Sequence, residues 1–352
     1  MQALVLRGDW DIAVEEREDP RPGPGEVMLE VVATGICGSD IHGYTGENGR
    51  RHPGQVMGHE TVGRVHSVGL DVGTGASGLS PGSLVTVNPV IACGECPTCR
   101  QGAEQACAHR QVIGVAPDIV SAFAQYLVAP ARNVVPLAEA LPEEYGALVE
   151  PLAVGYHAAL RGSCSDGDRV LVVGGGPIGQ ACAIAAQRLG VERVVVSEPT
   201  ASRRDVVAAL GATPVDPTAV QLDEAVSDVL GEPATLVLDA VGTSRTLDDA
   251  LTASALGSRV VLVGMGAPKV ELAAYAVSTE ERTIVGSFSY SAQDFRDTAR
   301  WVGGVPEQLH QLVDGRVDLR GAPQAFRELG EGTSTASKVL VFPHGVPPED
   351  SR

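Results

Sequence analysis

The chain has 352 residues, too many for one ordinary hydrophobic core, so we predict two domains. Hydrophobic residues make up 44% of it, yet no apolar run approaches the roughly 20 residues that a bilayer requires, which excludes a membrane protein. The net charge of −18 excludes the basic footprint of proteins that bind nucleic acids or anionic lipids, so small-molecule partners are predicted.

The N-terminal residues contain no basic leader followed by a long apolar region. We therefore predict no export and a cytoplasmic location. Lysine is rare: Lys269 and Lys338 are the only lysines, and we assign no function to this bias.

Short apolar segments separated by turns fill the first half of the chain and predict an all-β unit. Residues 21–25 and 71–75 are rich in glycine and proline, so they are predicted to be surface turns. The predicted strands are residues 3–6, 27–33, 61–68 and 84–87.

Three side chains of metal-binding type lie between the second and third of these strands. Cys37 offers a thiolate, His59 an imidazole and Glu60 a carboxylate, which are the donor types that bind zinc. A catalytic metal site is the leading interpretation. In the alternative, Cys37 is a small buried residue and His59 is a packed core histidine.

Four of the seven cysteines follow the spacing C-x2-C-x2-C-x7-C, with Gly94, Pro97 and Gly102 supplying tight turns between them. Four thiolates close a tetrahedral shell and leave no position for substrate, so this pattern predicts a structural zinc site. An iron–sulfur cluster is the alternative, although its cysteine spacing usually differs. The predicted ligands are Cys93, Cys96, Cys99 and Cys107.

Glu150 lies immediately before Pro151 and a helix predicted over residues 152–161. The proline biases Glu150 toward an extended backbone and suits the first turn of that helix. Glu150 is therefore a second candidate carboxylate for the metal site. The alternative is an acid that only stabilises a helix N-terminus.

The pattern changes at Asp168. An apolar run over residues 169–173 is typical of a parallel strand covered on both faces, and a helix is predicted over residues 178–189. Between them, Gly174, Gly176 and Gly179 fit G-x-G-x-x-G, in which missing side chains let a pyrophosphate approach backbone N–H groups. This region therefore predicts a dinucleotide-binding domain.

The next predicted strand, residues 194–197, ends at Glu198, close to the spacing at which an acid binds the adenosine ribose. A carboxylate there repels a 2′-phosphate and favours NAD over NADP. Arg203 and Arg204 keep NADP open, because either cation could bind a phosphate, although an arginine can equally stack on adenine. In the alternative, Glu198 is only a surface acid at a strand end.

Two further βα units extend a doubly wound parallel sheet: a strand over 235–239 with a helix over 244–255, and a strand over 260–263. The turn after the last strand is predicted to line the cofactor cleft. The remaining predicted cofactor contacts are Pro177, Ile178, Val263, Met265, Ser287 and Ser289.

The last part of the chain predicts amphipathic helices around residues 293–301 and 306–313. It ends with a strand over residues 338–342. We expect this segment to return to the first domain.

With these motifs in place, the chain from Met1 to about Pro343 resembles the zinc-dependent medium-chain dehydrogenase/reductases, the alcohol dehydrogenase superfamily. The resemblance rests on residues 35–42, 58–60 and 150–152, on the four-cysteine segment and on the glycine loop, all in family order. The Glu-Pro-Leu form at 150–152 is similar to the polyol, butanediol and threonine dehydrogenase branch.

The resemblance implies an α/β fold of two domains. A Rossmann dinucleotide-binding domain, residues 155–285, is inserted between the parts 1–154 and 286–352 of a GroES-like, β-rich catalytic domain. A structural zinc lobe is expected at about 90–110. A homodimer or homotetramer is implied as well.

The resemblance also implies the site chemistry. Cys37, His59 and either Glu60 or Glu150 surround a catalytic zinc, and a proton relay runs from Ser39 through the cofactor ribose to His42. A hydroxyl can donate and accept protons, and an imidazole titrates near neutrality. A surface histidine is the alternative for His42. The implied reaction interconverts a secondary alcohol and its ketone by hydride transfer with NAD.

The predicted substrate contacts are Tyr44, Phe288 and Tyr290. By the resemblance, sorbitol dehydrogenases carry Tyr after the relay histidine and Arg in a Phe-Arg-Tyr motif, whereas Gly43 and Ser289 stand there in this chain. This departure argues against a long polyol and leaves a smaller diol, an amino alcohol or a specialised secondary alcohol open; the sequence does not choose among them. A zinc-free NADPH quinone-type reductase and a non-enzymatic zinc and dinucleotide sensor are the alternatives.

Overall fold

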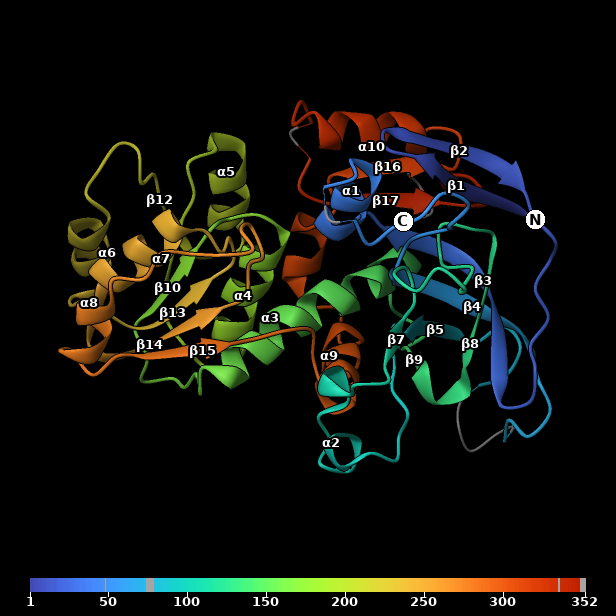
Figure 1. Cartoon of the computed structure of the whole chain (residues 1–352), viewed down its shortest axis with the longest axis horizontal. Helices are drawn as coiled ribbons and strands as arrows, with labels where there is room; N and C mark the ends of the chain where they lie inside the picture. Colours follow the sequence, from blue (N-terminus) through green and yellow to red (C-terminus); the bar gives the residue numbers. More distant parts are fainter. Residues whose placement is uncertain (48, 74–78, 335, 349–352) are drawn as a thin grey trace. The chain divides into compact units, whose positions relative to one another are not determined.

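A computed structural model of the chain describes residues 1–47, 49–73, 79–334 and 336–348. The turn predicted over residues 71–75 lies partly outside them. The chain divides into two units: unit 1 comprises Met1–Glu150 and Ser291–Arg352, and unit 2 comprises Pro151–Tyr290 (Figure 1).

The main sheet of unit 1 is built around β3 and β4, which pair antiparallel with Gly35 opposite Glu60. This register brings the end of β3, just before Cys37, beside the start of β4. The strands in spatial order are β16 (Gly315–Asp318), β17 (Val339–Phe342), β3 (Glu26–Gly35), β4 (Glu60–Val68), β5 (Leu84–Val87) and β9 (Val134–Pro136), with β8 (Tyr126–Pro130) also paired to β3.

The last strand, β17, pairs antiparallel with β3, so the end of the chain returns to unit 1 as predicted. Two smaller sheets complete the strands of this unit: β1 (Gln2–Gly8) with β2 (Asp11–Glu16), and β6 (Val90–Ile91) with β7 (Gln111–Val112). The helices are α1 (Gly38–Tyr44), α2 (Pro97–Arg100), η1 (Glu104–Ala106), η2 (Ala131–Asn133), η3 (Glu143–Leu148), α9 (Ala292–Val302), η4 (Glu307–Gln311) and α10 (Ala322–Gly330), with α3 (Val149–Arg161) leading into unit 2.

Unit 2 is the doubly wound parallel sheet that the sequence predicted. All neighbouring strands are parallel, and every residue of the central β10 is buried because helices cover both faces of the sheet. The strands in spatial order are β12 (Thr213–Val215), β11 (Val194–Ser197), β10 (Val170–Val173), β13 (Ala234–Asp239), β14 (Ser254–Leu262) and β15 (Thr283–Gly286). The helices are α4 (Pro177–Arg188), α5 (Ala201–Ala209), α6 (Leu222–Leu230), α7 (Ser244–Thr252) and α8 (Ala274–Ser278).

Two predicted elements differ from the structure. The helix predicted over residues 244–255 ends at Thr252, because Ser254 already pairs with Ala234 in the sheet and β14 begins there. The amphipathic helix predicted over residues 306–313 is only the short 3-10 helix η4. A single 3-10 turn places apolar residues at spacings close to those of an α-helix. The hydrophobic pattern of the sequence therefore cannot distinguish the two.

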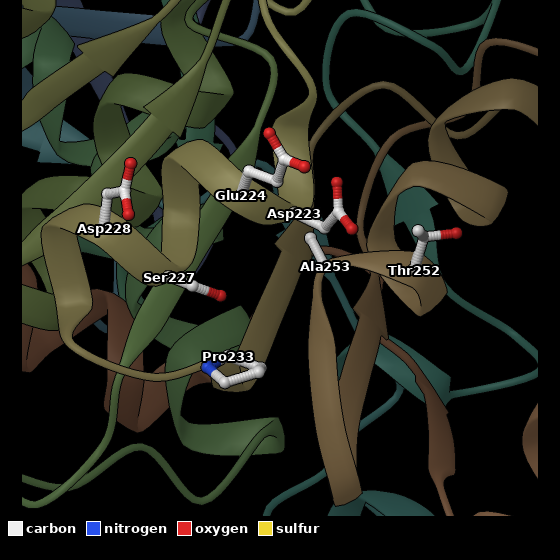
Figure 2. A pocket seen from close by; sticks show the side chains of 7 residues that line it. All are labelled: Asp223, Glu224, Ser227, Asp228, Pro233, Thr252 and Ala253. Atoms are coloured by element: carbon white, nitrogen blue, oxygen red, sulfur yellow. The ribbon is translucent and has the colours of Figure 1, made fainter.

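A hollow beside α6 carries the side chains of Asp223, Glu224 and Asp228 (Figure 2). Its other lining residues come from the same helix, from Pro233 and from the end of α7. None of the residues that line it belongs to the glycine loop or to the predicted metal sites. The helices of the described ranges are too short or too polar to traverse a bilayer.

Candidate metal centre and cofactor loop

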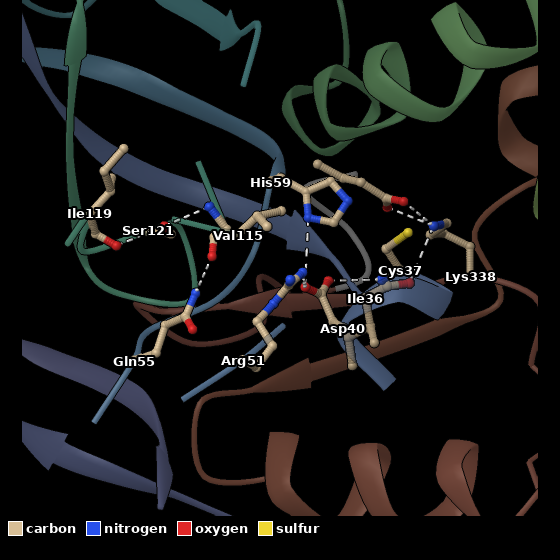
Figure 3. Close-up of polar contacts among 12 residues, drawn as sticks. Ile36, Cys37, Asp40, Arg51, Gln55, His59, Val115, Ile119, Ser121 and Lys338 are labelled. Carbon is tan, nitrogen blue, oxygen red and sulfur yellow. Dashed lines mark hydrogen bonds and ion pairs between the residues drawn. The ribbon is translucent and has the colours of Figure 1, made fainter. Parts of the chain in front are cut away.

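Three predicted zinc donors, Cys37, His59 and Glu60, converge at the end of the β3–β4 pair (Figure 3). One donor atom from each lies within 4.8 Å of the other two. Cys37 precedes α1, His59 precedes β4, and Glu60 is the first residue of that strand. Since His59 and Glu60 are buried, the centre is largely shielded from water.

Glycines make this close approach possible. A Cβ atom at Gly35 would lie only 2.1 Å from Oε2 of Glu60. Gly58 has φ +97°, and a Cβ atom there would lie 2.9 Å from the backbone nitrogen of Phe123. Any side chain at Gly35 would therefore displace Glu60, and one at Gly58 would strain the turn that presents His59.

Asp40, on α1, is fully buried beside the imidazole of His59. Its Oδ1 lies 3.6 Å from Nδ1 of His59 and 3.8 Å from Nη2 of Arg51, and its Oδ2 accepts a hydrogen bond of 3.2 Å from the backbone N–H of Cys37. Burial alone would raise the pKa of Asp40, but His59 and Arg51 lower it overall. Asp40 therefore stays ionised and orients the imidazole.

The pocket favours a positive charge at His59. Burial lowers the pKa of His59, but the negative charges of Asp40 and Cys37 outweigh it and raise the pKa well above its ordinary value. A field that stabilises an imidazolium also attracts a metal cation. Together with a thiolate, an imidazole and a carboxylate within bonding range of one point, this field fits zinc.

Lys338, just before β17, is the basic partner of this centre. Its Nζ donates to both carboxylate oxygens of Glu60, at 2.7 Å to Oε1 and 2.6 Å to Oε2, and to the carbonyl oxygen of Ile36 at 3.2 Å (Figure 3). Both side chains are buried. Burial lowers the pKa of Lys338, but the charges of Glu60 and Cys37 raise it overall.

Glu150 is the second residue of α3, so the extended backbone expected before Pro151 is wrong: the helix begins at Val149 and includes the proline in its first turn. Glu150 is buried there, outside the group of three converging donors. Its charge nevertheless acts on Lys338, whose pKa it helps to raise. The two predicted relay residues lie on α1: Ser39 is partly buried, and His42 is half exposed with its Nε2 3.8 Å from Oε2 of Glu47.

The four cysteines Cys93, Cys96, Cys99 and Cys107 also converge, and all are free thiols. All four sulfur atoms lie within 4.8 Å of one another, and four of the sulfur–sulfur distances are 3.4 to 3.9 Å. A tetrahedral zinc site with bonds of about 2.3 Å has sulfur–sulfur edges of about 3.8 Å, so this cluster fits the ion without rearrangement. Backbone N–H groups of Glu95 and Cys96 lower the pKa of Cys93 to about 6, which favours the thiolate that zinc requires.

The glycine loop follows β10 in the predicted place. Gly174 has φ +95°, and a Cβ atom at Gly179 would lie 1.7 Å from the carbonyl oxygen of Gly174. Gly176 is the N-cap of α4, whose first residues are Pro177 and Ile178. The loop therefore presents backbone N–H groups at a helix N-terminus, the arrangement that binds phosphate.

Glu198 stands at the end of β11 and is buried. Its Oε2 accepts a hydrogen bond of 2.8 Å from Gly175 N–H, and its Oε1 one of 2.7 Å from Thr200 N–H. The side chain thus holds the glycine loop against the second strand. Because each carboxylate oxygen can accept a further hydrogen bond, a ribose diol remains a compatible ligand.

Arg203 and Arg204, the two arginines after Glu198, have different contacts. Nη1 of Arg204 donates to the carbonyl oxygens of Glu198 and Pro199 and pairs with Asp216, so it braces the turn. Nη1 of Arg203 lies 3.9 Å from the Cβ position of Gly176, beside the glycine loop. Of the two, Arg203 is therefore placed to meet a phosphate.

The other predicted cofactor contacts lie after β14 and β15. Val263 is partly buried, and Met265 is 61% exposed. Ser287 and Ser289 are partly buried, and Ser289 has φ +55°.

The predicted substrate contacts separate into buried and exposed residues. Phe288 is 50% exposed, whereas Tyr290 is buried. Tyr44 is also buried: it packs between Trp10 and Phe326, and its hydroxyl donates to the carbonyl oxygen of Trp10. Tyr44 is therefore a core residue rather than a substrate contact, because all of its surface is already used in packing.

Gly43 has a packing explanation that the sequence did not reveal. A Cβ atom there would lie 2.3 Å from Cγ of Arg51, so the glycine leaves room for the stem of the buried arginine. Sequence reasoning also missed Asp40, Arg51 and Lys338. Asp40 lies in the same short motif as Cys37, and the rarity of lysine was the only signal for Lys338.

Comparison with known proteins agrees with this geometry. Residues 23–139 match the alcohol dehydrogenase GroES-like domain, and residues 177–303 match the zinc-binding dehydrogenase domain. The chain is 33% identical over 301 residues to L-galactonate-5-dehydrogenase of Escherichia coli K12, covering 85% of this chain and 86% of that protein.

Solved structures show the same fold. A protein described as a zinc-binding dehydrogenase from Sinorhizobium meliloti 1021, bound to NADP, has a TM-score of 0.88 and 29% identity, covering 97% of this chain and 99% of its own. An alcohol dehydrogenase from Escherichia coli CFT073, complexed with NADH, has a TM-score of 0.86 and 28% identity with the same coverage. The chain therefore belongs to the zinc-dependent alcohol dehydrogenase superfamily of medium-chain dehydrogenase/reductases and is an oxidoreductase of that type.

Proposed function

We propose that this protein uses one catalytic and one structural zinc ion and NAD to interconvert a hydroxylated secondary alcohol and its ketone. The observation that carries the proposal is the convergence of Cys37, His59 and Glu60 beside a buried Asp40. The glycine loop of unit 2 supports the nucleotide part of the proposal.

The residues of the chain have distinct parts in this reaction. When bound, zinc acts as a Lewis acid that stabilises negative charge on the substrate oxygen. Cys37, His59 and one carboxylate, Glu60 or Glu150, hold the ion, and Asp40 fixes the orientation of the imidazole. The half-exposed His42 receives the proton lost by the substrate hydroxyl and passes it to water, with Ser39 on the same helix as the donor side of the relay.

We propose NAD as the cofactor. Glu198 places a buried carboxylate beside the glycine loop, where a 2′-phosphate would be repelled, and Arg204 is committed to backbone carbonyls and Asp216. Arg203 then stacks on adenine or contacts the pyrophosphate. Initial rates should favour NAD over NADP, and Glu198→Gln should narrow that difference. A wild-type preference for NADP would contradict this assignment.

For the substrate, we propose a secondary alcohol with a neighbouring polar group, such as a diol, a polyol or an amino alcohol. The similarity to L-galactonate-5-dehydrogenase supports hydroxylated substrates. A screen of NAD reduction across simple secondary alcohols, vicinal diols, polyols, sugar acids and β-hydroxy amino acids tests this. Activity confined to simple alcohols would overturn the proposed substrate class.

We further propose a cytoplasmic homodimer or homotetramer. The exposed apolar side chains of Val270, Leu272 and Tyr275, which precede edge strand β15 in the chain, support self-association. Light scattering coupled to size-exclusion chromatography tests the oligomeric state, and cell fractionation tests the location. A monomer at micromolar concentration would refute the oligomer.

The central experiment is metal analysis. The wild-type protein should contain two zinc ions per chain, one at the four cysteines and one at Cys37. Cys37→Ala should lose one zinc and the dehydrogenase activity while its circular dichroism spectrum stays unchanged. Two bound metals and full turnover in this variant would show that the catalytic site has been wrongly assigned.

A further inference from the structure

Two buried polar side chains near the metal centre, those of Gln55 and Ser121, have no part in the proposed reaction. Gln55 is 3% exposed and Ser121 is fully buried. We propose that both are positioning residues: they hold the backbone of Gly114 and Val115 against the imidazole of His59, so that this ring stays in place to bind the metal. The inference rests on the proposed function, since it concerns a ligand of the same metal centre.

Each of the two side chains binds a different end of this short backbone segment (Figure 3). Oγ of Ser121 accepts a hydrogen bond of 2.7 Å from the N–H of Gly114 and donates one of 3.0 Å to the carbonyl oxygen of Ile119. Nε2 of Gln55 donates a hydrogen bond of 3.0 Å to the carbonyl oxygen of Val115. Together, Gln55 and Ser121 form a clamp on residues 114–115.

The clamp is attached to the turn that presents His59. Ala122, which follows Ser121, donates its backbone N–H to the carbonyl oxygen of Gly58 at 3.2 Å. Gln55 precedes the same turn in the chain, and its Oε1 accepts a hydrogen bond of 3.2 Å from the backbone N–H three residues earlier. The clamp and the metal ligand therefore belong to one hydrogen-bonded unit.

The clamped backbone lies directly against the imidazole. A Cβ atom at Gly114 would lie 3.0 Å from Nδ1 of His59 and 3.0 Å from the carbonyl oxygen of Gly58. Gly114 also has φ +85°, a conformation that favours glycine. The segment therefore approaches the ring as closely as a backbone without a side chain allows.

This contact falls on the ring nitrogen that faces Asp40. Oδ1 of Asp40 lies 3.6 Å from Nδ1 of His59, and His59 is buried. Because Gly114 packs beside Nδ1, the clamp leaves little room for water to replace the carboxylate there. An imidazole that keeps a carboxylate partner at Nδ1 carries its proton on that nitrogen and offers Nε2 to a metal.

Two readouts that do not depend on turnover test the proposal. The first is the visible absorption of the cobalt(II)-substituted protein, from which the spectrum of Cys37→Ala is subtracted to remove the four-cysteine site. The second is zinc affinity at the Cys37 centre, measured by competition with a chelator. The variants are Ser121→Ala, Gln55→Met and the double variant. Ser254→Ala is the matched control, because it removes another buried hydroxyl, which donates to the carbonyl oxygen of Leu251 at 3.1 Å in unit 2.

Ser121→Ala and Gln55→Met should each shift the cobalt spectrum and weaken zinc binding about tenfold, because a loosened backbone no longer confines the imidazole. The double variant should weaken zinc binding about 100-fold. Ser254→Ala should lower Tm and leave the spectrum and the affinity unchanged. The four-cysteine site should keep its metal in every variant, which provides an internal control.

A second background tests whether the clamp acts through Nδ1 of His59. In Asp40→Asn this nitrogen has already lost its carboxylate partner, so adding Ser121→Ala should weaken zinc binding only about twofold or less. An equal loss with and without the Asp40 carboxylate would overturn the proposal, because the clamp would then act elsewhere.

The proposal is also overturned if the double variant keeps the wild-type spectrum and zinc affinity, since a lowered Tm alone would make Gln55 and Ser121 packing residues. An equal spectral shift in Ser254→Ala would overturn it as well. Ser121→Ala removes a single oxygen atom and decides the matter even if the double variant does not fold. A wild-type protein without metal at Cys37 would instead refute the proposed function, which is a separate result.

Discussion

The two donor clusters of unit 1 are built in opposite ways. Cys93 and Cys107 delimit a single short segment, in which turns and the small helix α2 bring four sulfur atoms to within 4.8 Å of one another. The centre at Cys37 combines residues from β4, from the turn before α1 and, through Lys338, from the end of the chain. One cluster is local, and the other depends on the whole sheet.

This difference predicts different roles for the two clusters. Four thiolates can close a complete tetrahedral shell around zinc, so we expect the local cluster to stabilise a lobe with little apolar surface of its own. The dispersed centre has mixed donors, a buried acid and a buried lysine, so its charge and geometry can be adjusted residue by residue. The local cluster should govern stability, and the dispersed centre should govern activity.

The sharpest test exchanges one cysteine in each cluster. Cys37→Ser should lower kcat by at least about 10³-fold, because Lewis-acid stabilisation contributes several kcal/mol, while Tm changes little. Cys107→Ser should lower Tm and release the structural metal. Metal content, turnover and thermal unfolding are measured for both variants. The comparison breaks down if Cys37→Ser destabilises the fold as much as Cys107→Ser does.

A smaller effect is expected at Asp40. Asp40→Asn should weaken metal binding at the Cys37 centre by about 10–100-fold, the usual size when the partner of a ligating histidine is changed. The four-cysteine site should keep its metal, which serves as the internal control. Equal loss of both metals would mean that the two clusters are not independent.

The lowered pKa of Asp40 also predicts the direction in which folding stability changes with pH. Its folded-state pKa is lowered, so its ionised form stabilises the fold above the unfolded pKa, and that stabilisation is lost as the pH falls through the folded pKa. Urea unfolding of the metal-free protein across this acidic range should therefore show a shallower loss of stability in Asp40→Asn. Parallel pH curves would contradict the lowered pKa.

Gly35→Ala should cost about 1–3 kcal/mol of stability, since its Cβ would overlap the carboxylate of Glu60. Gly38→Ala is the matched control, because nothing lies within 4 Å of its Cβ position and it stands at the start of α1. Urea unfolding measures both. Similar values for the two variants would remove the steric argument for the position of Glu60.

The smallest effect is expected around the local cluster. Arg132→Met removes a hydrogen bond of 3.0 Å from Nη2 to the carbonyl oxygen of Ala92, on an exposed side chain. It should cost about 1 kcal/mol or less and leave the structural metal in place. Loss of that metal would show that the four-cysteine lobe depends on its surroundings after all.

Much of the fold could be predicted because its signals are short in range. The strands β5 and β11 were predicted with the bounds that the structure shows, since each is a brief apolar run between turns. The parallel sheet followed from the alternation of such runs with helices and from the glycine loop after β10. The four-cysteine cluster was equally visible, because its donors and turns are contiguous.

Only part of the candidate site could be predicted from the sequence. Donor types identified Cys37, His59 and Glu60, but the partners of these residues had no local signal. Tyr44 was misassigned because its burial depends on Trp10 and Phe326, which are distant in the sequence. The sequence showed that Gly43 departs from the sorbitol dehydrogenase pattern. Only the structure explains the glycine, because the side chain of Arg51 packs against it.

The amino-acid sequence by itself determined the fold class, the spacing of the structural cysteines and the chemistry available at Cys37 and His59. Those properties reside in hydrophobic periodicity and in donor atoms, which are local. The tertiary structure alone decided that Lys338 pairs with Glu60, 278 residues away in the chain. Sheet register creates that contact, and register is a cooperative property of strands that the chain brings together only when it folds.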